Sequence, residues 1–341
     1  MLKTAVVILN WNGIKFLKQF IPKLVAYSNT ETGLFVIDNA STDDSNEFLR
    51  SNYPQISIIH NKENLGFAKG YNEGLKHIEA EYYCLLNSDV EVTPDWDKDI
   101  VEFMDKHPEV GVCQSKLLSF IHKDEFEYAG ASGGYIDMLG YPFCRGRLFT
   151  TMEKDYHQYD DIAEVFWASG ACMFVRKQIY HQLNGLDDDF FTHMEEIDFC
   201  WRVKSANYKV MCFPKSVVYH YGGGALAMGS PKKTFYNFRN NLIMLYKNLP
   251  TNQLFRVFTL RFFLDVVAAC RFLFDTGVKD FVAVFKAYVD FIWTIKKTHQ
   301  KRKQITHQTK DLTKIYKRII IIQYFLLKKT KFSDLNKEDF M

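Results

Sequence analysis

The sequence contains little proline and glycine, and its net charge is close to zero. Its 341 residues include 8 Pro and 18 Gly, and the formal net charge is +3. A collagen-like or low-complexity chain would need far more of both residues, and a disordered chain would carry fewer aromatic side chains than the 16% found here. These shortages exclude three classes and indicate one large folded domain with an appendage, or two domains.

Paired cysteines are also missing. The seven cysteines form no CxxC pair and show no short regular spacing; they are Cys84, Cys113, Cys144, Cys172, Cys200, Cys212 and Cys270. Neither a disulfide framework nor a zinc knuckle is indicated. We therefore expect a reducing compartment, in which most of the thiols are small core residues.

No hydrophobic run is long enough to cross a membrane. The N-terminus has a five-residue apolar run before Asn10 and no small-residue cleavage site, so it predicts a first β-strand and not a signal peptide. Charged residues interrupt the longer apolar stretches, and the run at 319–327 has only nine residues, where a spanning helix needs about 20.

The two parts of the chain carry opposite charge. Residues 1–246 have a net charge of −8 and residues 247–341 a net charge of +11. Two amphipathic, aromatic-rich stretches, 254–274 and 277–295, precede a basic run at 296–303. This pattern favours helices on an anionic membrane surface, although packing on the first domain or on a second subunit stays open, with a homo-oligomer as one form of it. Because the basic residues alternate with apolar faces, nucleic acid is not expected.

Short apolar runs alternate with helical stretches through the first 115 residues. This alternation predicts an α/β fold with a mostly parallel sheet, in which ligands bind at the carboxyl ends of the strands. The sequence lacks GxGxxG after the first strand and lacks GxxxxGK[ST], which weighs against dinucleotide-binding and P-loop proteins. Strands are expected at 4–9, 34–38, 56–60, 82–87 and 110–114, and helices are expected to start near Gly13, Ser41, Gly66 and Pro94.

The predicted strand ends are rich in Asn and Asp, and further motifs follow in order along the chain. They are Asn10-Trp11-Asn12, Asp38 to Asp43, Glu63 to Gly74, Asn87-Ser88-Asp89, Val165 to Arg176, Asp187 to Arg202, and Val217 to Ala225. Taken together, residues 4–246 resemble the family 2 glycosyltransferases, inverting enzymes with a GT-A fold, and especially their bacterial rhamnosyltransferase-like branch. The resemblance implies a catalytic domain at 1–246, followed by a helical basic extension at 247–341.

The resemblance implies a nucleotide-sugar site and a divalent metal, Mg²⁺ or Mn²⁺. Asp89 ends the counterpart of a DxD motif whose first Asp is Asn87 here, and His220 is the second expected metal ligand. Asp38 is expected at the nucleobase, and Gly222–Gly224 would suit a loop over the diphosphate, where Ala225 replaces a frequent hydroxyl residue. The expected nucleotide-sugar contacts are Asn10, Asn12, Asp38, Asn64, Gly66, Lys69, Asn72, Asn87, Ser88 and Asp89. Turn formation, helix capping or close helix packing is the alternative for each of them.

The resemblance also implies a catalytic base and an acceptor site. Glu196, the second acid of an acidic pair, is the expected base, and Glu195 is the second candidate. The acceptor side is expected at Trp167, Gly170 and Trp201, with Trp167 as a sugar-stacking platform, although a Trp in an apolar run is more often a core residue. Asp198 and Arg202 have the spacing of an intrahelical ion pair, so a structural role is expected for Asp198.

The sequence thus predicts a metal-dependent glycosyltransferase that uses a UDP- or dTDP-sugar and a glycan or lipid-linked glycan acceptor. We expect it in the cytoplasm, on the inner face of the cell membrane. A non-catalytic GT-A-like module that binds a nucleotide sugar or a glycan is the alternative. A nucleotidyltransferase is less favoured, because no Gly-rich loop with Lys or Arg follows Leu9.

Overall fold

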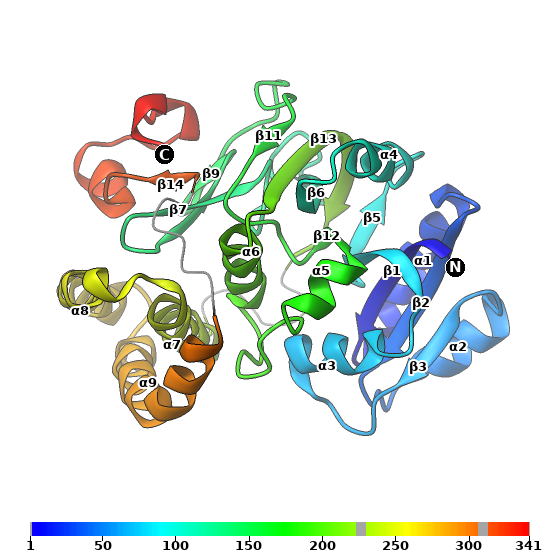
Figure 1. Cartoon of the computed structure of the whole chain (residues 1–341), viewed down its shortest axis with the longest axis horizontal. Coiled ribbons are helices and arrows are strands. Elements are labelled where there is room, and N and C mark those ends of the chain that lie inside the picture. Colours follow the sequence, from blue (N-terminus) through cyan, green and yellow to red (C-terminus); the bar gives the residue numbers. More distant parts are fainter. Residues whose placement is uncertain (1, 223–229, 306–312, 341) are drawn as a thin grey trace.

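The computed structural model describes residues 2–222, 230–305 and 313–340. A nine-stranded sheet runs through the molecule in the order β11-β13-β6-β12-β4-β1-β2-β3, with β5 paired to β13 (Figure 1). Its strands are β1 (Leu2–Asn10), β2 (Thr32–Asp38), β3 (Ser57–His60), β4 (Ala80–Leu86), β5 (Val90–Val92), β6 (Val110–Ser119), β11 (Ala163–Glu164), β12 (Cys172–Arg176) and β13 (Lys209–His220). β1 pairs in parallel with both β2 and β4, and β2 pairs in parallel with β3. β6 and β13 are also parallel, and β12 is antiparallel to both β4 and β6. The predicted α/β class and mostly parallel sheet are confirmed.

Helices cover both faces of this sheet because its strands are apolar on both sides. In β1, Val6 and Ile8 join one buried cluster with residues of α1, α2 and α4, while Ala5 and Val7 join a second cluster with residues of α3, α5, α6 and α7. This is the two-residue alternation of a strand buried on both faces. The helices are α1 (Ile14–Tyr27), α2 (Ser45–Asn52), α3 (Gly66–Leu75), α4 (Lys98–Lys106), α5 (Lys177–Gln182), α6 (Glu195–Ser205), α7 (Pro231–Asn248), α8 (Thr251–Asp275) and α9 (Val278–Gln304).

The helix starts agree with the predictions at two places and differ at two. α1 and α3 begin within one residue of the expected positions, whereas α2 and α4 begin four residues later than expected. Before α2, the Asp43 carboxylate accepts the backbone N–H groups of Ile14 and Ser45, the first residues of α1 and α2, at 3.0 and 3.2 Å. The structural role expected for Asp43 is therefore a shared helix cap.

A second, five-stranded sheet packs beside the central one, and it includes one short strand from the C-terminal extension, whose helices α8 and α9 agree with the prediction. Its strands are β7 (Gly134–Asp137), β8 (Pro142–Cys144), β9 (Arg147–Leu148), β10 (Thr151–Met152) and β14 (Ile315–Tyr316). β14 pairs in parallel with β7, and Tyr316 is fully buried against Phe143. Three short helical turns follow, at Ile322–Leu326, Phe332–Asp334 and Lys337–Asp339. The end of the chain therefore returns to the catalytic domain, because its aromatic side chains complete that core.

Helices α7, α8 and α9 form a bundle beside the sheets, at the lower left of Figure 1. Tyr246, where the charge of the sequence changes sign, lies inside α7 and contacts Phe258 and Phe291 of the next two helices. No helix within the described residues combines the length and the apolar character needed to cross a membrane. Of the seven cysteines, six are buried and Cys270 on α8 is exposed.

The sheet topology brings distant polar residues to one edge. β1, β2, β4, β6 and β13 all run in the same direction, so their carboxyl ends lie at the same edge of the sheet. β5 then folds back against the end of β13, with Val90 opposite His220. This register places Asp89, next to Val90, beside His220.

Candidate active site

Asp89 and His220 meet at the carboxyl edge of the sheet. His220 Nε2 lies 3.1 Å from Asp89 Oδ1, and both side chains are buried. Asn87 Nδ2 lies 3.4 Å from the same ring nitrogen. The structure thus brings together the two side chains that were expected to hold a metal, although they lie far apart in the sequence.

Glu127 is a third member of this cluster, and no motif in the sequence identified it. Its Oε1 lies 3.2 Å from His220 Nδ1, and its side chain is also buried. Burial opposes protonation of His220, but the two carboxylates outweigh burial and raise the pKa of His220 to about 10. The same imidazole holds the pKa of Asp89 below its usual value, against the effect of burial. The two buried carboxylates therefore favour the protonated form of His220.

This cluster fits a divalent cation. An imidazole nitrogen and a carboxylate oxygen suit Mn²⁺, and an ion at His220 Nε2 would replace the proton that His220 now shares with Asp89. Glu127 would remain on the other ring nitrogen and fix the orientation of the ring, as carboxylates do in many histidine metal sites. Asp89 and His220 are thus the residues that would hold the metal.

The acidic pair Glu195 and Glu196 starts α6, directly after a strained turn. His193 and Met194 both have φ near +71°, in the left-handed region that residues other than glycine rarely occupy. Asn240 of α7 holds the turn by donating from Nδ2 to the carbonyl oxygens of Thr192 and His193, each at 2.8 Å. Such strain persists only where neighbouring groups hold it, and it fixes where the two glutamates point.

The two glutamates differ in exposure. Glu195 is buried, while Glu196 is partly exposed. Within the described parts of the chain, neither Oε2 atom has a hydrogen-bond partner. Burial, together with the charge of Glu196, raises the pKa of Glu195 well above its usual value, and burial raises the pKa of Glu196 to about 7. Of the two, Glu196 is the less buried residue and has the less strongly raised pKa, which favours it over Glu195 as a general base.

Gly170 connects the glutamates to the edge of the sheet. A Cβ at Gly170 would lie 3.9 Å from the Cβ of Glu196 and 3.3 Å from the ring of Phe67. The next residue, Ala171, accepts the backbone N–H of Asn87 at 3.0 Å. Gly170 therefore lies between the acidic pair and the Asn87–Asp89 turn, a location compatible with the expected acceptor role.

Asp38, Asn10 and Asn12 lie together at the ends of β2 and β1. Asp38 is buried and accepts the N–H of Ser41 at 3.2 Å and the amide of Asn46 at 3.0 Å. Asn10 donates to Ser41 Oγ at 3.1 Å, and Asn12 accepts the N–H of Thr42 at 2.7 Å. Asn12 is exposed, with φ of 51°. The nucleobase contact of Asp38 stays a prediction, in a loop that these bonds keep rigid.

Gly13 brings the ends of β1 and β4 close together. A Cβ at Gly13 would lie 2.3 Å from Asn10 Oδ1 and 3.7 Å from Ser88 Oγ. The Asn10 Oδ1 atom is buried without a hydrogen-bond partner in the described part of the protein. A buried acceptor that lacks a donor is costly, so Asn10 fits a ligand contact.

Asn64, Gly66 and Asn72 were expected at the nucleotide, and in the structure each of them also makes contacts that support the fold. Both polar atoms of the Asn72 side-chain amide are fully hydrogen-bonded. Nδ2 donates to the Leu186 carbonyl and to Asp188, and Oδ1 accepts from the Tyr180 hydroxyl and the Leu186 N–H. Asn64 Oδ1 accepts from Asn39 and from the N–H of Gly66.

Gly66 itself is needed for close packing. Its φ is +75°, and a Cβ there would lie 2.8 Å from the Phe191 carbonyl oxygen. Lys69 alone of the α3 candidates is exposed, and it has no side-chain partner within the described residues. The nucleotide contact of Lys69 stays a prediction.

Trp167 and Trp201 are core residues, which contradicts the stacking platform expected at Trp167. Trp167 is 3% exposed, and its Nε1 donates to the Tyr135 carbonyl at 2.9 Å. A Cβ at Gly134 would lie 2.0 Å from the Trp167 ring, so the backbone covers that face. Trp201 is 2% exposed and packs edge-on against Phe166. Neither ring leaves a face open for a sugar.

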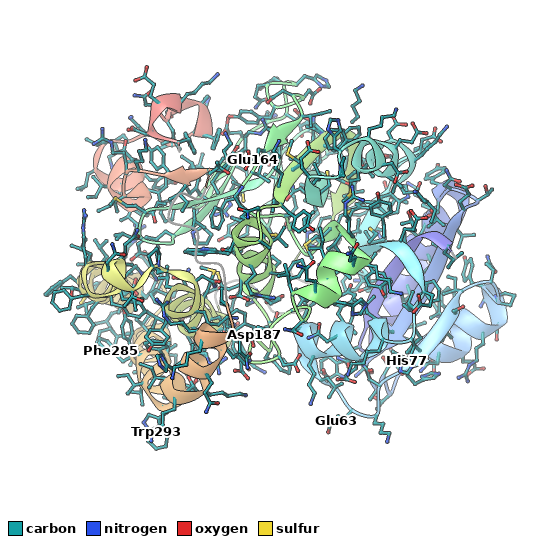
Figure 2. All side chains as sticks on the ribbon, in the orientation of Figure 1. Glu63, His77, Glu164, Asp187, Phe285 and Trp293 are labelled. Atoms are coloured by element: carbon teal, nitrogen blue, oxygen red, sulfur yellow. The ribbon has the colours of Figure 1, made fainter. Side chains whose placement is uncertain are left out.

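The acidic loop, residues 187–194, is tied to the helix bundle by buried ion pairs. Lys247 of α7 contacts Asp187 and, at 2.9 Å, Asp198, while Lys301 of α9 contacts Asp187 and Asp189. Asp187 lies where α6 meets the bundle (Figure 2). Burial would raise the pKa of Asp187, but Lys247 and Lys301 outweigh it and hold that pKa well below the usual value. Arg202 also pairs with Asp198, at 2.9 Å, which confirms the expected intrahelical pair.

Arg239 and Asn241 of α7 also stabilise this region, because both side chains bond to groups of the protein. Arg239 donates to the Asp189 carbonyl and pairs with Asp290, both at 2.7 Å, and Asn241 donates to the Gly140 carbonyl at 2.8 Å. A cavity of about 350 Å³ lies beyond the ion pairs, and its walls include Asp187, Arg202, Lys247 and Lys301. Because these charged groups are already paired, the cavity is not the donor site.

Lys233, near the start of α7, faces the cluster at the edge of the sheet. Its Nζ lies 6.0 Å from the ring centroid of Tyr128, next to Glu127, and it has no ion-pair or hydrogen-bond partner within the described residues. Burial lowers the pKa of Lys233, and Glu127 opposes this effect. Burial, and then Lys233, lower the pKa of His193 to about 4, so the lysine lies between the two halves of the site.

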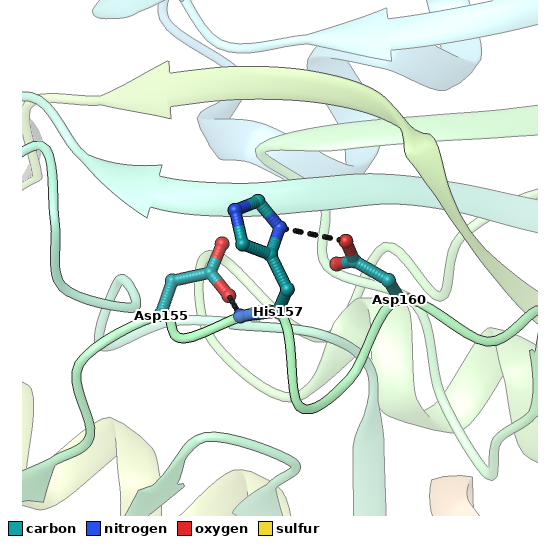
Figure 3. A group of neighbouring side chains, drawn as sticks. All are labelled: Asp155, His157 and Asp160. Atoms are coloured by element: carbon teal, nitrogen blue, oxygen red, sulfur yellow. Dashed lines mark hydrogen bonds and ion pairs between the residues drawn. The ribbon is translucent and has the colours of Figure 1, made fainter.

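An acidic cluster outside this site has its own counter-charge. Asp155, His157 and Asp160 gather in one loop (Figure 3), with His157 Nδ1 at 2.8 Å from Asp160. The buried ammonium of Lys116 contacts Asp160 and lies 2.8 Å from Asp155. Lysine thus already supplies the positive charge that a cation would bring there. Of the glycines expected over the diphosphate, Gly223 and Gly224 lie outside the described residues, as does Ala225.

Comparison with known proteins assigns the chain to a family. Residues 5–183, more than half of the chain, match the family described as "Glycosyl transferase family 2". The chain belongs to this family. The family 2 chain is 22% identical over 223 residues to an N-acetylglucosaminyl-diphospho-decaprenol L-rhamnosyltransferase of Mycobacterium tuberculosis, which covers 60% of this chain and 71% of that protein. It is also 22% identical to the low-salt glycan biosynthesis hexosyltransferase Agl10 of Haloferax volcanii, over 70% of this chain and 74% of that protein.

Solved glycosyltransferase structures share the fold. GalNAc-T7 with UDP, GalNAc and Mn²⁺ superposes with a TM-score of 0.59 at 13% identity, over 87% of this chain and 58% of that one. Residues 1–349 of TarS from S. aureus, in complex with UDP-GlcNAc, give a TM-score of 0.56 at 16% identity, over 88% and 84% of the two chains. The family 2 chain therefore has the GT-A fold that the sequence predicted, and it is a glycosyltransferase.

Proposed function

We propose that this glycosyltransferase transfers a sugar, with inversion at the anomeric carbon, from a UDP- or dTDP-sugar to a hydroxyl of a lipid-linked cell-surface glycan. One observation carries the proposal: Gly170 lies beside the partly exposed Glu196, and the next residue, Ala171, bonds to Asn87 of the turn that carries Asp89 of the buried Asp89–His220–Glu127 cluster. The name of the relative from Mycobacterium tuberculosis includes a lipid-linked diphosphosugar, which supports a lipid-linked acceptor. Within the family, we place the chain in the bacterial rhamnosyltransferase-like branch.

Glu196 is proposed as the base. With a pKa of about 7, it is ionised in a large fraction of molecules at neutral pH and can take the proton of the acceptor hydroxyl. Glu195, buried and with a more strongly raised pKa, would remain neutral beside it and limit repulsion within the pair. The acceptor oxygen would then attack the anomeric carbon from the face opposite the diphosphate, which inverts configuration and needs no covalent glycosyl-enzyme intermediate.

Asp89 and His220 would hold Mg²⁺ or Mn²⁺ against the diphosphate. A divalent ion there, when bound, supplies Lewis-acid stabilisation of the leaving diphosphate. Glu127 would keep the His220 ring oriented, and Lys233 would bring a second positive charge to the same phosphates. Asp38 would accept the N–H of the uracil or thymine base, and Asn10, Asn12, Asn87, Ser88 and Lys69 would border the nucleotide. Gly170 would leave room for the acceptor.

A panel of nucleotide sugars tests the proposal. The purified protein is heated with UDP-, dTDP- and GDP-sugars, each with Mn²⁺ and with EDTA, and the stabilising donors are then assayed for transfer to a lipid-linked acceptor. We expect a UDP- or dTDP-sugar to raise the Tm only with metal, and to be turned over. Binding of a donor without transfer or hydrolysis would favour the non-catalytic alternative. Preference for a GDP-sugar would contradict the proposed contact of Asp38 with a uracil or thymine base.

A further inference from the structure

Helix α8 buries two charged residues and exposes several large apolar ones. Arg261 and Asp265 are 2% and 0% exposed, whereas Phe255 and Phe274 are each 86% exposed. A surface helix of a water-soluble protein usually buries its apolar stripe and exposes its charges.

A buried polar network explains the inward side. Arg261 lies 3.7 Å above the Tyr141 ring and donates to the Leu139 carbonyl, so it is anchored to the catalytic domain. Asp265 accepts from Tyr141 at 2.7 Å and from Tyr288 of α9 at 2.8 Å. These contacts fix the rotation of α8, so the exposure of its apolar side follows from satisfied partners and not from loose packing.

The exposed apolar side continues onto α9 and forms what we term the outer face. Trp293 is 83% exposed and projects from the outer edge of the bundle (Figure 2). The seam between the helices, where Phe262 packs against Tyr288, is itself half exposed at Phe262. The outer face comprises Phe255, Phe262, Phe263, Val267, Phe274, Val278, Val282, Val289, Ile292 and Trp293. Exposed apolar side chains in this number on two neighbouring helices indicate contact with a membrane or another protein.

The charges around this face select between the possible partners. The exposed charged residues of α8 and α9 are Arg256, Arg271, Asp275, Lys279, Lys286, Lys296, Lys297 and Lys303. The single acid, Asp275, is already paired with Arg271 at 2.8 Å. Two copies docked through this face would oppose like charges, whereas lipid phosphates would complement them, and lysine stems can bury while their ammonium groups reach the headgroups.

We propose that the outer face of α8 and α9 lies in the headgroup region of an anionic bilayer, with its aromatic side chains in the acyl boundary. This proposal rests on the proposed function, because membrane binding would bring the site to a lipid-linked acceptor. The link within the molecule is short, because Lys297 and Lys301 of α9 pair with Asp189 and Asp187 of the acidic loop that precedes Glu195 and Glu196.

Vesicle sedimentation of the full-length protein tests this surface without any substrate. Vesicles contain phosphatidylcholine alone, or equal parts of phosphatidylcholine and phosphatidylglycerol. We expect binding to the anionic vesicles, a drop of about tenfold in the partition coefficient for each of Phe263→Ser and Trp293→Ser, and about fivefold for each of Lys279→Gln, Lys286→Gln and Lys296→Gln. All five side chains are exposed, so these variants should fold normally.

Matched controls lie on other parts of the surface. Tyr156 is 76% exposed on a remote loop, and Lys98 and Lys106 are exposed on α4. Tyr156→Ser and the pair Lys98→Gln with Lys106→Gln should leave vesicle binding unchanged. Equal loss in these controls, or no binding by the unmodified protein, would overturn the proposal.

Two further readouts separate the alternatives. Light scattering that shows a dimer in the unmodified protein and a monomer in Phe263→Ser would assign the outer face to a second copy and overturn the bilayer proposal. Calorimetry with UDP and Mn²⁺ should give the same affinity for Trp293→Ser as for the unmodified protein. Vesicle binding without any nucleotide binding would leave the surface in place and reject the proposed donor.

Discussion

Two buried charge clusters in this protein differ in how their charge is balanced. In the loop cluster, Asp187 and Asp198 are paired with Lys247, Lys301 and Arg202. In the edge cluster, Asp89 and Glu127 share one imidazole, that of His220. The first cluster is neutralised by fixed lysine and arginine side chains, whereas the second has two carboxylates for one titratable ring. A buried cluster that lacks fixed counter-charge is the one suited to a cation, so charge balance separates structure from function here.

The largest effect is expected at Glu196, the proposed base. Glu196→Gln should lower the transfer rate by about 10²–10⁴-fold, because the amide cannot accept the acceptor proton. The affinity for the nucleotide diphosphate, measured by calorimetry, should not change. Glu195→Gln is the matched control, and it should cost far less, since burial raises the pKa of Glu195 well above its usual value and a neutral amide suits that site. A large loss in Glu195→Gln with near-normal turnover in Glu196→Gln would exchange the two roles.

A substitution in the loop cluster should mainly lower the stability of the fold. Lys247→Met removes the cation shared by Asp187 and Asp198 and should lower the free energy of unfolding by about 3–5 kcal/mol, as measured in urea. The loss should shrink as pH falls below 3.8, the ordinary carboxyl value, because a depressed pKa stabilises the fold only while the unfolded carboxyl would be ionised. The exposed pair Arg271–Asp275 is the control, and Arg271→Gln should cost under about 1 kcal/mol. Equal costs for the two substitutions would remove the contrast between buried and exposed pairs.

Glu127 should matter for metal binding more than for folding. Glu127→Gln removes the charge that faces His220 Nδ1 and should weaken Mn²⁺ binding by about 10–100-fold. The titration is done by calorimetry in the presence of UDP. Glu153→Gln, another buried glutamate of the neighbouring segment, serves as the control and should leave Mn²⁺ affinity unchanged. Identical metal affinity in Glu127→Gln would show that the ring is oriented without it.

The pH dependence sharpens the role of Glu196. A base whose pKa is about 7 loses its active form on acidification, so kcat/KM should fall about tenfold for each pH unit below 7. Stability should move the other way, since a carboxyl with a raised pKa stabilises the fold at low pH and loses this contribution as pH rises through 7. A rate profile that is flat from pH 5 to pH 8 would contradict Glu196 as the base, because its pKa of about 7 lies inside that range.

Most of the fold was predictable because it depends on local patterns. The alternation of short apolar runs and helical stretches predicted the strands β1, β2, β3, β4 and β6 and the parallel sheet, and the resemblance extended this to the GT-A fold. The return of the chain through β14 was not predicted, since the two-residue strand at Ile315 shows no alternation of its own and is defined by its pairing with β7. The sequence of α8 indicates two faces, but it does not say which residues of the helix are buried. That depends on contacts with Tyr141 and Leu139, which lie far away in the sequence.

The site was predictable where a motif carries the chemistry and not where a contact does. Asp89 and His220 follow from their motifs, and the structure brings them to 3.1 Å. Glu127 has no motif, and it enters the site only because the chain after β6 passes the His220 ring. Asn72 and Trp167 were expected at ligands, but in the structure their N–H groups donate to backbone carbonyls. A polar or aromatic side chain in a motif looks the same in sequence whether its hydrogen bonds go to a ligand or to the protein.

Calorimetric titration of UDP and dTDP, with Mn²⁺ and with EDTA, tests most directly whether the edge cluster holds the cation for the diphosphate. The unmodified protein and Asp89→Ala are compared, with Ser88→Ala as a neighbouring control. We predict that removing the metal or the Asp89 carboxylate weakens binding of the nucleotide by about tenfold or more, and that Ser88→Ala changes it little. Equal affinity under all these conditions would contradict the assignment of Asp89 and His220 as the metal site.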